Sequence, residues 1–294
     1  MAAAIPRDEI LARLHAQTRA GKSILVVGAG NGLMARCAEA GGVDIIVCYS
    51  TGYFRLNGLP SLAGQLPLGN ANDISLQIGR DWVMPVIKNT PVICGIYAVD
   101  PTRSIASMLD AVENAGMSGV INFPSVGRFT GDWRRELEAS GFGFDHELRM
   151  VSEARRRGLF TMAYAYGEME AEQMAEAGVD CLIAHVGLTA GGDIGAIYNI
   201  GLDEAVERMN TIFSHVRRIN KESILLAHGG PISSPEDVEY AISRTEAVGF
   251  VAASSFERIP VEEALKSACA AFKNVSVNVG AAGSTAQGPV KSVS

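Results

Sequence analysis

Two of the five histidines in this 294-residue chain follow short apolar runs at matching positions. His185 ends the run "DCLIAH", and His228 ends the run "SILLAH". An imidazole can act as a general acid or base near neutral pH, and it is also a common ligand of divalent metals. Because both histidines stand where an apolar strand should give way to a loop, we expect them to serve one site.

Carboxylates follow two other apolar runs. Asp100 ends "VICGIYAVD", and Glu257 follows "AASS". With the histidines they would suit either metal ligation, by His185, His228 and Glu257, or acid–base chemistry in which the carboxylates orient the imidazoles. The competing interpretations are that Asp100 only caps a helix and that Glu257 is only an acidic residue in a first helical turn.

Glycines and hydroxyls at the ends of the apolar runs 223–230 and 248–255 predict a binding site for a phosphate or carboxylate. Gly229 and Gly230 would let backbone N–H groups approach an anion, and Ser254 and Ser255 would add hydroxyls. The alternative is that "GGP" makes a turn and Ser234 caps the next helix. Other strand-end candidates for substrate binding are Gly28, Gly30, Asn31, Asn122, Tyr164 and Arg258.

These residues need a scaffold that brings eight strand ends together. Apolar runs of strand length alternate with amphipathic stretches along the whole chain. The predicted strands are 23–30, 43–50, 91–100, 119–124, 159–165, 180–187, 223–230 and 248–255. The predicted helices between and after them are 33–40, 73–87, 102–115, 146–157, 168–177, 202–219, 235–244 and 260–272.

Eight such units in about 250 residues predict a single α/β domain, a (β/α)₈ TIM barrel over 1–278, whose site lies at the carboxyl ends of the strands. A doubly wound open sheet is the rival, but it usually has fewer strands. An extra helix over 7–20 should close the bottom of the barrel. Long loops at 51–72 and 125–145, which carry Arg55 and Arg128, suggest a lid or a subunit contact. The segment 279–294 is expected to be a flexible tail.

The composition limits the classes of binding partner that the chain could have. The net charge of −7 argues against nucleic acid and an acidic membrane surface, although a small anionic substrate remains compatible. Neither a secretory signal nor a membrane span is evident, so a cytoplasmic location is expected. The five cysteines lie in apolar segments and are interpreted as small core residues of a protein in a reducing compartment. Apolar rim loops suggest a homo-oligomer.

Two chemistries are disfavoured. No lysine stands at the carboxyl end of a predicted strand, which argues against a Schiff-base enzyme. The stretch "GAGNGL" does not match the spacing of a dinucleotide-binding turn, so no nucleotide cofactor is expected.

The ordered strand-end motifs resemble a known family. They are "VGAGNGLMARCAEAGGVDIIVCY", "SLAGQLPLGNAN", "NFPSVG", "AHVGLTAGGDIGA", "AHGGPISSPEDVEY" and "ASSFERIPVE". Over about residues 5–275 the chain is similar to the phosphoenolpyruvate hydrolase-like family of barrel proteins, to which the C-terminal part of the tomato Tm-1 virus-resistance protein is also related.

The resemblance implies an enzyme that cleaves a C–C bond, or less readily a P–C bond, in a small oxo acid or β-dicarbonyl-like substrate through an enolate. A divalent ion (Mg²⁺, Mn²⁺ or Zn²⁺) would polarise the carbonyl. Two alternatives stay open: a non-catalytic barrel that senses a ligand or binds a partner, and a metal-free lyase or isomerase that uses histidine acid–base chemistry.

Overall fold

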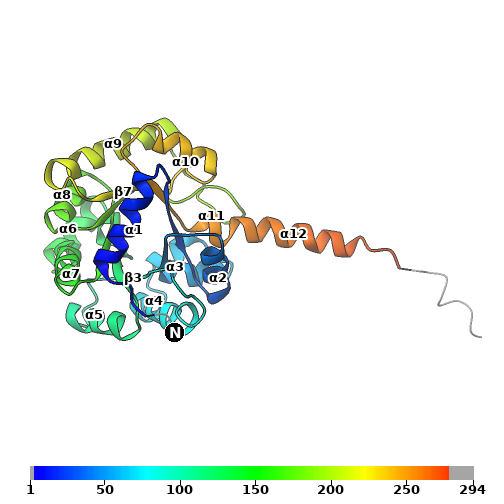
Figure 1. The fold of residues 1–294 in the computed structure, drawn as a ribbon, viewed down its shortest axis with the longest axis horizontal. Coiled ribbons are helices and arrows are strands. Elements are labelled where there is room, and N and C mark those ends of the chain that lie inside the picture. The colour runs from blue at the N-terminus through cyan, green and yellow to red at the C-terminus, as the bar shows by residue number, and fades with distance from the viewer. Residues whose placement is uncertain (1–2, 278–294) are drawn as a thin grey trace, which may run out of the picture.

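The fold is a closed barrel of eight parallel strands, seen end-on in the computed structural model of Figure 1, which describes residues 3–277. Each strand pairs with the next in the chain, and β8 pairs with β1 to close the ring. The strands are β1 (Ile24–Gly28), β2 (Ile45–Cys48), β3 (Val92–Ile96), β4 (Gly119–Asn122), β5 (Phe160–Ala165), β6 (Cys181–His185), β7 (Ile224–His228) and β8 (Gly249–Ala252). Every strand lies inside a predicted run, so the predicted TIM barrel is confirmed.

Helices follow the strands as the amphipathic stretches predict. They are α1 (Arg7–Arg19), α2 (Gly32–Ala40), α3 (Ser50–Leu56), α4 (Ala71–Gln77), α5 (Ile105–Asn114), α6 (Gly131–Ala139), α7 (Asp145–Arg156), α8 (Glu168–Glu176), α9 (Leu202–Ile219), α10 (Pro235–Ile242), α11 (Ser254–Glu257) and α12 (Ile259–Lys273). Ser234 caps α10 in a capping box with Asp237, so the capping interpretation of Ser234 is confirmed.

Three segments differ from the expected pattern. The predicted helix over 73–87 is the short α4 followed by a π-helical segment, η2 (Ile78–Val83). The loop 51–72 contains most of α3 and a 3₁₀ turn, η1 (Ser61–Gln65), and the loop 125–145 contains a second turn, η3 (Val126–Arg128), and α6. These loops therefore fold as short helical pieces.

Alternate residues of each strand separate two apolar layers. Side chains such as Val26, Ile183 and Leu226 fill the barrel interior, whereas neighbours such as Val27 and Leu182 pack against the helices. This follows from the two-residue period of a strand, because successive side chains point to opposite faces. The parity matters for the site, since His185 shares its face with Ile183 and His228 shares its face with Leu226.

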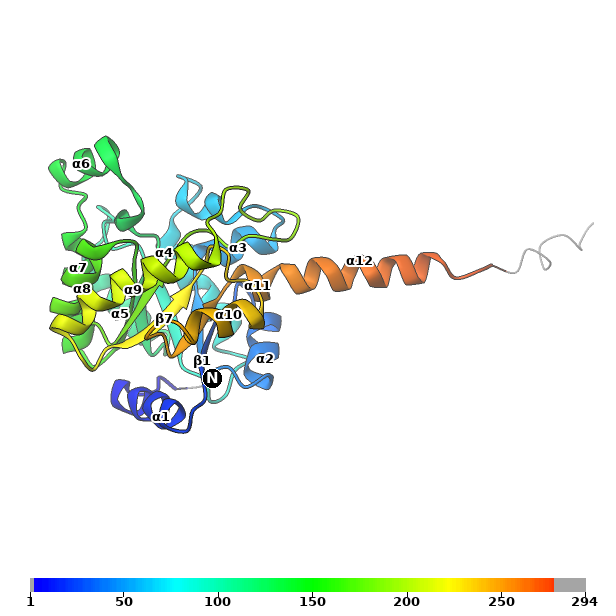
Figure 2. The ribbon, with the colours of Figure 1, turned by 90° about the horizontal axis from the view of Figure 1, so that it is seen from above.

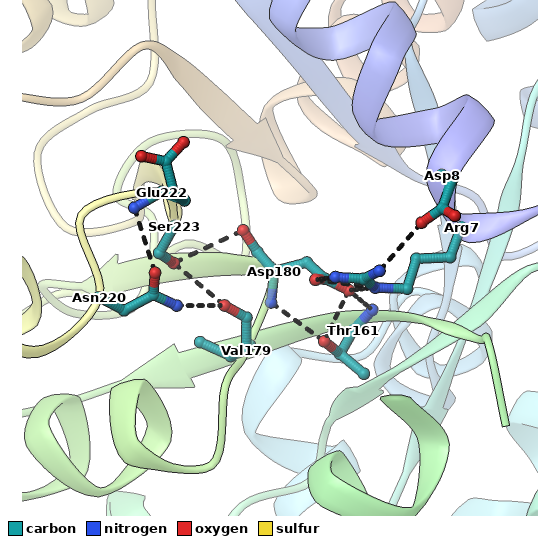
Figure 3. A network of polar contacts seen from close by, with 8 residues as sticks. All are labelled: Arg7, Asp8, Thr161, Val179, Asp180, Asn220, Glu222 and Ser223. Atoms are coloured by element: carbon teal, nitrogen blue, oxygen red, sulfur yellow. Dashed lines mark hydrogen bonds and ion pairs between the residues drawn. The ribbon is translucent and has the colours of Figure 1, made fainter. Parts of the chain in front are cut away.

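Helix α1 closes the amino-terminal end of the barrel, as predicted. Figure 2 shows α1 on the side opposite α3 and α6, and its Ile10 and Leu14 are buried against the barrel interior. Figure 3 shows how polar contacts fasten it: the Arg7 guanidinium donates through Nε and Nη2 to Asp180, at 2.7–3.0 Å. Asp180 also accepts from the backbone N–H and the hydroxyl of Thr161.

Two features depart from or extend the expectations. Cys48, Cys94 and Cys181 are buried, but Cys37 and Cys269 are exposed on helices, so the core interpretation is wrong for those two. In Figures 1 and 2, α12 projects away from the barrel, and none of its residues is buried. Among residues 3–277, no helix has the length and apolarity needed to cross a bilayer. The predicted tail over 279–294 lies outside the described residues.

Candidate functional site

The two predicted histidines meet at the carboxyl-end mouth of the barrel. His185 and His228 are paired in register on the neighbouring strands β6 and β7. Their ring centroids lie 4.8 Å apart with the ring planes at 70°, and both rings line one cavity. The structure therefore brings these two residues together, as their positions in the sequence indicate.

The backbone around the imidazoles assigns each ring a different neutral tautomer. Nδ1 of His228 lies 2.7 Å from the Val251 carbonyl oxygen, which can only accept, so this nitrogen carries the proton and Nε2 keeps a basic lone pair. Nδ1 of His185 accepts from the Gly187 N–H at 3.3 Å, so the proton of neutral His185 is on Nε2. One ring thus presents an acceptor and the other a donor.

Burial keeps both rings neutral. Desolvation lowers the pKa of His228 to about 4, which the neighbouring Arg55 and Arg128 reinforce and the hydrogen bond to Val251 opposes. Desolvation, with His228 as the next cause, also lowers the pKa of His185 well below its ordinary value. At neutral pH His228 is therefore an available base rather than an imidazolium.

Two tyrosines form the floor beneath the imidazoles. The Tyr164 ring centroid lies 5.2 Å from that of His185 and 5.0 Å from that of His228. The hydroxyls of Tyr49 and Tyr164 are 2.8 Å apart, so one donates to the other and the second proton stays available to a ligand. Burial raises the pKa of both phenols, which keeps them protonated.

Arg55, from the loop after β2, reaches the site in a buried ion pair with Glu257. Its Nε donates to Glu257 Oε2 at 2.5 Å, and its Nη1 donates to Ser61 Oγ at 3.2 Å. The two charged side chains are 4% and 0% exposed. Removing either one would therefore leave the other as an uncompensated buried charge. Glu257 Oε2 thus neutralises Arg55, while Glu257 Oε1 is buried without a hydrogen-bond partner. The predicted roles of Glu257 as a ligand or an orienting group stay predictions.

Arg128, from η3 after β4, brings positive charge that is not neutralised. It lines the cavity and is half-buried, and no carboxylate pairs with it within residues 3–277. Its charge contributes to the lowered pKa of both histidines. An unpaired guanidinium beside neutral donors suits an anionic ligand, because it offers a planar fork to a carboxylate or phosphate.

The cavity itself is narrow, at about 30 Å³. That is room for two or three water molecules, each of which needs roughly 10–15 Å³ of such space. Its wall comes from strand ends and from three loops. The lining residues are Tyr49, Thr51, Arg55, Ser61, Gln65, Phe123, Arg128, Tyr164, His185, Leu188, Thr189, His228, Ala253 and Ser254.

Two predicted residues lie at the same end of the barrel but serve the framework. Asp100 faces a different hollow and accepts from Asn70, Asn72 and Thr102; although burial opposes this, these hydrogen bonds lower its pKa to about 2. Asn122 is fully buried and exchanges hydrogen bonds with the backbone N–H and C=O of Tyr164. Asn122 therefore fixes the floor tyrosine and does not line the cavity.

The remaining predicted ligands separate in the same way. Ser254 lines the cavity, whereas Ser255 faces a groove on the outside of the barrel. Arg258 donates to the Gly191 carbonyl at 2.6 Å and holds the loop after β6. Their proposed contacts with an anion stay predictions, with Ser254 the better placed of the three.

The predicted glycines make close packing possible. Gly229 and Gly230 adopt positive φ angles of 83° and 59°, and the Gly230 N–H donates to the Gly187 carbonyl at 3.0 Å. Added Cβ atoms on Gly28 and Gly30 would lie 3.1 Å from Tyr49 and 2.6 Å from Gly52. Asn31 caps α2 by accepting from the Met34 N–H. In this structure these residues position the mouth and do not line the cavity.

The donor set does not fit a Mg²⁺ ion. Mg²⁺ prefers six oxygen ligands with carboxylates among them, whereas the residues that line the cavity present imidazoles, phenols, arginines and neutral hydroxyl and amide groups but no carboxylate. Glu257, the predicted third ligand, is held by Arg55. In the described part of the chain, no cluster of three or more His, Cys, Asp or Glu side chains is placed to hold a metal ion.

Sequence reasoning placed Arg55 and Arg128 in a lid or contact but not in the site. Both lie in unusually long connections at the carboxyl ends of the strands. That position in the sequence is the feature that could have placed them in the site. Buried Glu147 was missed altogether. Desolvation raises its pKa to about 8, against hydrogen bonds from Asn122, Ser125 and the Val126 N–H. It thereby ties the η3 turn that carries Arg128 to the barrel.

The fold and this site define a TIM-barrel protein with a histidine-centred cavity, and the comparison with known proteins gives the family. The chain belongs to the phosphoenolpyruvate hydrolase-like family, whose model matches residues 9–275.

Two curated relatives are tomato proteins. The ToMV susceptible protein tm-1(GCR26) of Solanum lycopersicum is 46% identical over 272 residues, and the ToMV resistance protein Tm-1(GCR237) of the same species is 45% identical over 272 residues. Each alignment covers 92% of this chain but 36% of the relative. The chain therefore spans about a third of the length of these relatives.

Solved structures support the architecture. A phosphonopyruvate hydrolase in complex with oxalate and Mg²⁺ superposes with a TM-score of 0.58 at 17% identity, covering 90% of this chain and 87% of the other. A phosphoenolpyruvate phosphomutase from Streptomyces platensis subsp. rosaceus has the same TM-score and coverage at 16% identity. At such low identity these likenesses show the fold alone.

Proposed function

We propose that this chain is an enzyme that binds a small anionic oxo acid and cleaves a C–C bond, or less readily a P–C bond, by histidine acid–base chemistry. The observation that carries the proposal is the pair of neutral imidazoles of opposite tautomer facing one cavity beside an unpaired arginine. Membership in the phosphoenolpyruvate hydrolase-like family supports the substrate class. We favour the metal-free form over the metal-assisted form implied by the resemblance, because the cavity lining lacks the carboxylates that suit Mg²⁺ and Mn²⁺ and, in the described part of the chain, His185 and His228 have no third His, Cys, Asp or Glu side chain placed with them to hold Zn²⁺.

In this mechanism, Arg128 holds the substrate carboxylate. The 2-oxo group then accepts hydrogen bonds from His185 Nε2 and from the free hydroxyl proton of the Tyr49–Tyr164 pair. These donors stabilise the enolate oxygen as the bond to C3 breaks. Fixed donors in a buried site are effective because they need no reorganisation during the reaction.

His228 moves the proton. Its Nε2 takes a proton from the attacking water, the resulting hydroxide bonds to the departing acyl or phosphoryl group, and the electron pair of the broken bond forms the enolate. His228 then gives the proton to the enolate carbon, and the product is the shorter oxo acid. Because the pKa of His228 is about 4, its protonated ring is a strong enough acid to give the proton to the enolate carbon readily.

A substrate larger than a few waters needs the loops to open. Leu188 and Thr189 from the loop after β6 and Gln65 from η1 line the cavity. Closing these segments over a bound substrate would exclude bulk water and strengthen the electrostatic contacts inside. This agrees with the expected role of the long loops as a lid.

The same substitution at the two histidines tests the mechanism. The amide of Gln can replace a donor at Nε2 but has no basic nitrogen, so His185→Gln should retain activity within about tenfold, whereas His228→Gln should lose about 10²–10⁴-fold in kcat. The assay is release of the shorter oxo acid from phosphonopyruvate and other small 2-oxo acids, with EDTA present. His146→Gln, on a half-buried histidine that does not line the cavity, is the control.

Three outcomes would contradict the proposal. Equal activity of His228→Gln and the parent chain would remove the base, and full dependence on added Mg²⁺ would restore the metal-assisted mechanism. Absence of product from every 2-oxo acid, together with saturable binding of oxalate, would favour the second candidate.

The second candidate is a non-catalytic barrel that binds a small anion within a longer protein. Its support is that the chain spans about a third of two tomato relatives named for virus susceptibility and resistance. Oxalate calorimetry in EDTA and the product assay together distinguish the two, since a sensing barrel binds oxalate but releases no product from any 2-oxo acid.

A further inference from the structure

Five cavity side chains follow one another in strand order around the barrel mouth. Arg128 comes after β4, Tyr164 is on β5, His185 ends β6, His228 ends β7, and Ser254 comes directly after β8. In a closed ring of eight strands, β4 and β8 lie opposite each other. A ligand whose carboxylate is held by Arg128 therefore extends towards Ser254, with the tyrosine and both imidazoles along one side of it.

Two serine hydroxyls at the β8 side form a chain that begins at the buried ion pair. Arg55 Nη1 donates to Ser61 Oγ at 3.2 Å, and Ser61 Oγ lies 3.3 Å from Ser254 Oγ. A hydroxyl that accepts from a guanidinium becomes a stronger donor, because hydrogen bonds in a chain polarise one another. Ser61 therefore donates to Ser254, and the Ser254 proton is left for a ligand.

The charges around the cavity suit a ligand with one anionic group. Desolvation lowers the pKa of both imidazoles and keeps them neutral. Glu257 Oε2 neutralises Arg55. Of the charged side chains that line the cavity, Arg128 is then the one without a carboxylate partner in the described residues. A substrate carboxylate uses this charge, so the group at the Ser254 end should be uncharged.

Resting on the proposed function, we infer that the substrate is a 2,4-dioxo acid with one negative charge, an acylpyruvate, and that Ser254 binds the oxygen of its 4-oxo group. The atoms of such a molecule follow the order of the strand ends. Its carboxylate lies at Arg128, and its 2-oxo group lies at Tyr164 and His185. The bond between C3 and C4 then lies at His228, next to the base.

The reaction is hydrolysis of the C3–C4 bond. His228 Nε2 takes one proton from water, and the hydroxide oxygen bonds to C4, so the 4-oxo oxygen becomes an oxyanion that accepts a hydrogen bond from Ser254. As the C4 carbonyl forms again, the electron pair of the C3–C4 bond moves into the enolate. The proton on His228 then goes to C3. The products are a carboxylic acid, which keeps the oxygen and the second proton of the water, and pyruvate.

A phosphonate at the Ser254 end would have no cation to pair with. The related phosphate monoesters carry about 1.5–2 negative charges at pH 7. Neutral hydroxyls hold such a group less strongly than a guanidinium does. The inference therefore narrows the proposed function to the C–C bond.

Two substrates test the substrate class. Pyruvate release by the full chain is measured from acetylpyruvate and from phosphonopyruvate with EDTA present, and kcat/KM should be about 100-fold or more higher for acetylpyruvate. An equal or higher kcat/KM for phosphonopyruvate would overturn the inference and leave the proposed function standing. Absence of product from every 2-oxo acid would overturn both.

A serine variant tests the role of Ser254. Ser254→Ala should lower kcat for acetylpyruvate about 10²–10³-fold, as expected when a donor to an oxyanion is removed. The dissociation constant for oxalate should stay within about twofold, because oxalate resembles the enolate of pyruvate and does not extend to Ser254. Ser75→Ala, on a buried hydroxyl that has no hydrogen-bond partner and does not line the cavity, is the matched control.

Two results would overturn the role of Ser254. An unchanged kcat in Ser254→Ala would show that the 4-oxo group is bound elsewhere. A loss of oxalate affinity as large as the loss of turnover would show that Ser254 supports the whole cavity instead of one end of the substrate.

Discussion

The two ends of the barrel use polar side chains in opposite ways. At the amino-terminal end, Asp180 accepts two hydrogen bonds from Thr161 and further ones from Arg7, so its oxygens are occupied (Figure 3). At the carboxyl-terminal end, Arg128 has no carboxylate partner within the described residues, and His228 Nε2 keeps a free lone pair. The first end completes its polar contacts within the chain, and the second leaves them open to a ligand.

The difference separates stability from function. A buried charge with all its hydrogen bonds made contributes to the fold and is costly to disturb, because its partner would be left unpaired. Open donors and a cation around a cavity gain their partners only when a ligand binds. The two ends should therefore respond differently to the same kinds of substitution.

The largest effect on folding is expected at the closed end. Asp180→Asn removes the charge that holds Arg7 and one acceptor of Thr161, so the free energy of unfolding should fall by about 3 kcal/mol. Urea unfolding measures it. Oxalate binding by the folded fraction should not change.

The matched control is Arg149→Gln, which breaks an exposed pair with Asp145. It should cost roughly 0.3–0.5 kcal/mol. Equal losses in the two variants would mean that the Arg7–Asp180 contact does not fasten the closed end.

The open end should lose binding instead of stability. Arg128→Gln removes the unpaired guanidinium, so the dissociation constant for oxalate should rise by about 10- to 100-fold, as expected for a charged hydrogen bond of about 1.5–3 kcal/mol. Titration calorimetry measures the constant. Unchanged affinity would show that the anion binds elsewhere, and a large fall in unfolding free energy would make Arg128 part of the framework.

The smallest effect is expected from pH between 8 and 6. Since burial holds the pKa of His228 at about 4 in the folded chain, its ring stays neutral over that range, and kcat/KM should show no inflection near pH 6.5 from this residue. Nitrogen NMR of the imidazole checks this directly.

The lowered pKa of His228 also makes the free energy of unfolding depend on pH. A pKa lowered on folding means that the unfolded chain binds the proton more tightly, so the contribution of His228 is complete above about pH 6.5 and is lost as pH falls towards 4. An inflection in kcat/KM near pH 6.5 that disappears in His228→Gln would show that the ring is solvated rather than buried.

Much of the scaffold followed from local patterns. The runs ending in His185 and His228 are apolar throughout, so the sequence predicted that both histidines end a strand, but which face each one occupies came from the structure. The capping serine at 234 marked the start of α10. The projection of α12 could not be predicted, because its apolar face is what a helix packed on its own barrel would also show.

The sequence could not predict that Arg128 lines the cavity whereas Asp100 does not. Both stand just after strands, yet Asp100 is occupied by Asn70, Asn72 and Thr102, whereas Arg128 reaches the cavity through a turn fastened by Glu147. Those contacts join residues distant in the chain, so no local pattern reports them.

The amino-acid order by itself determined that eight strand–helix units alternate and that His185 and His228 end neighbouring strands, because hydrophobic periodicity is a local property. Tertiary structure alone decided which loop side chains share the cavity, how Glu257 is neutralised and where α12 goes. The physical reason is that hydrogen bonds and ion pairs between loops depend on three-dimensional proximity, which closure of the ring creates.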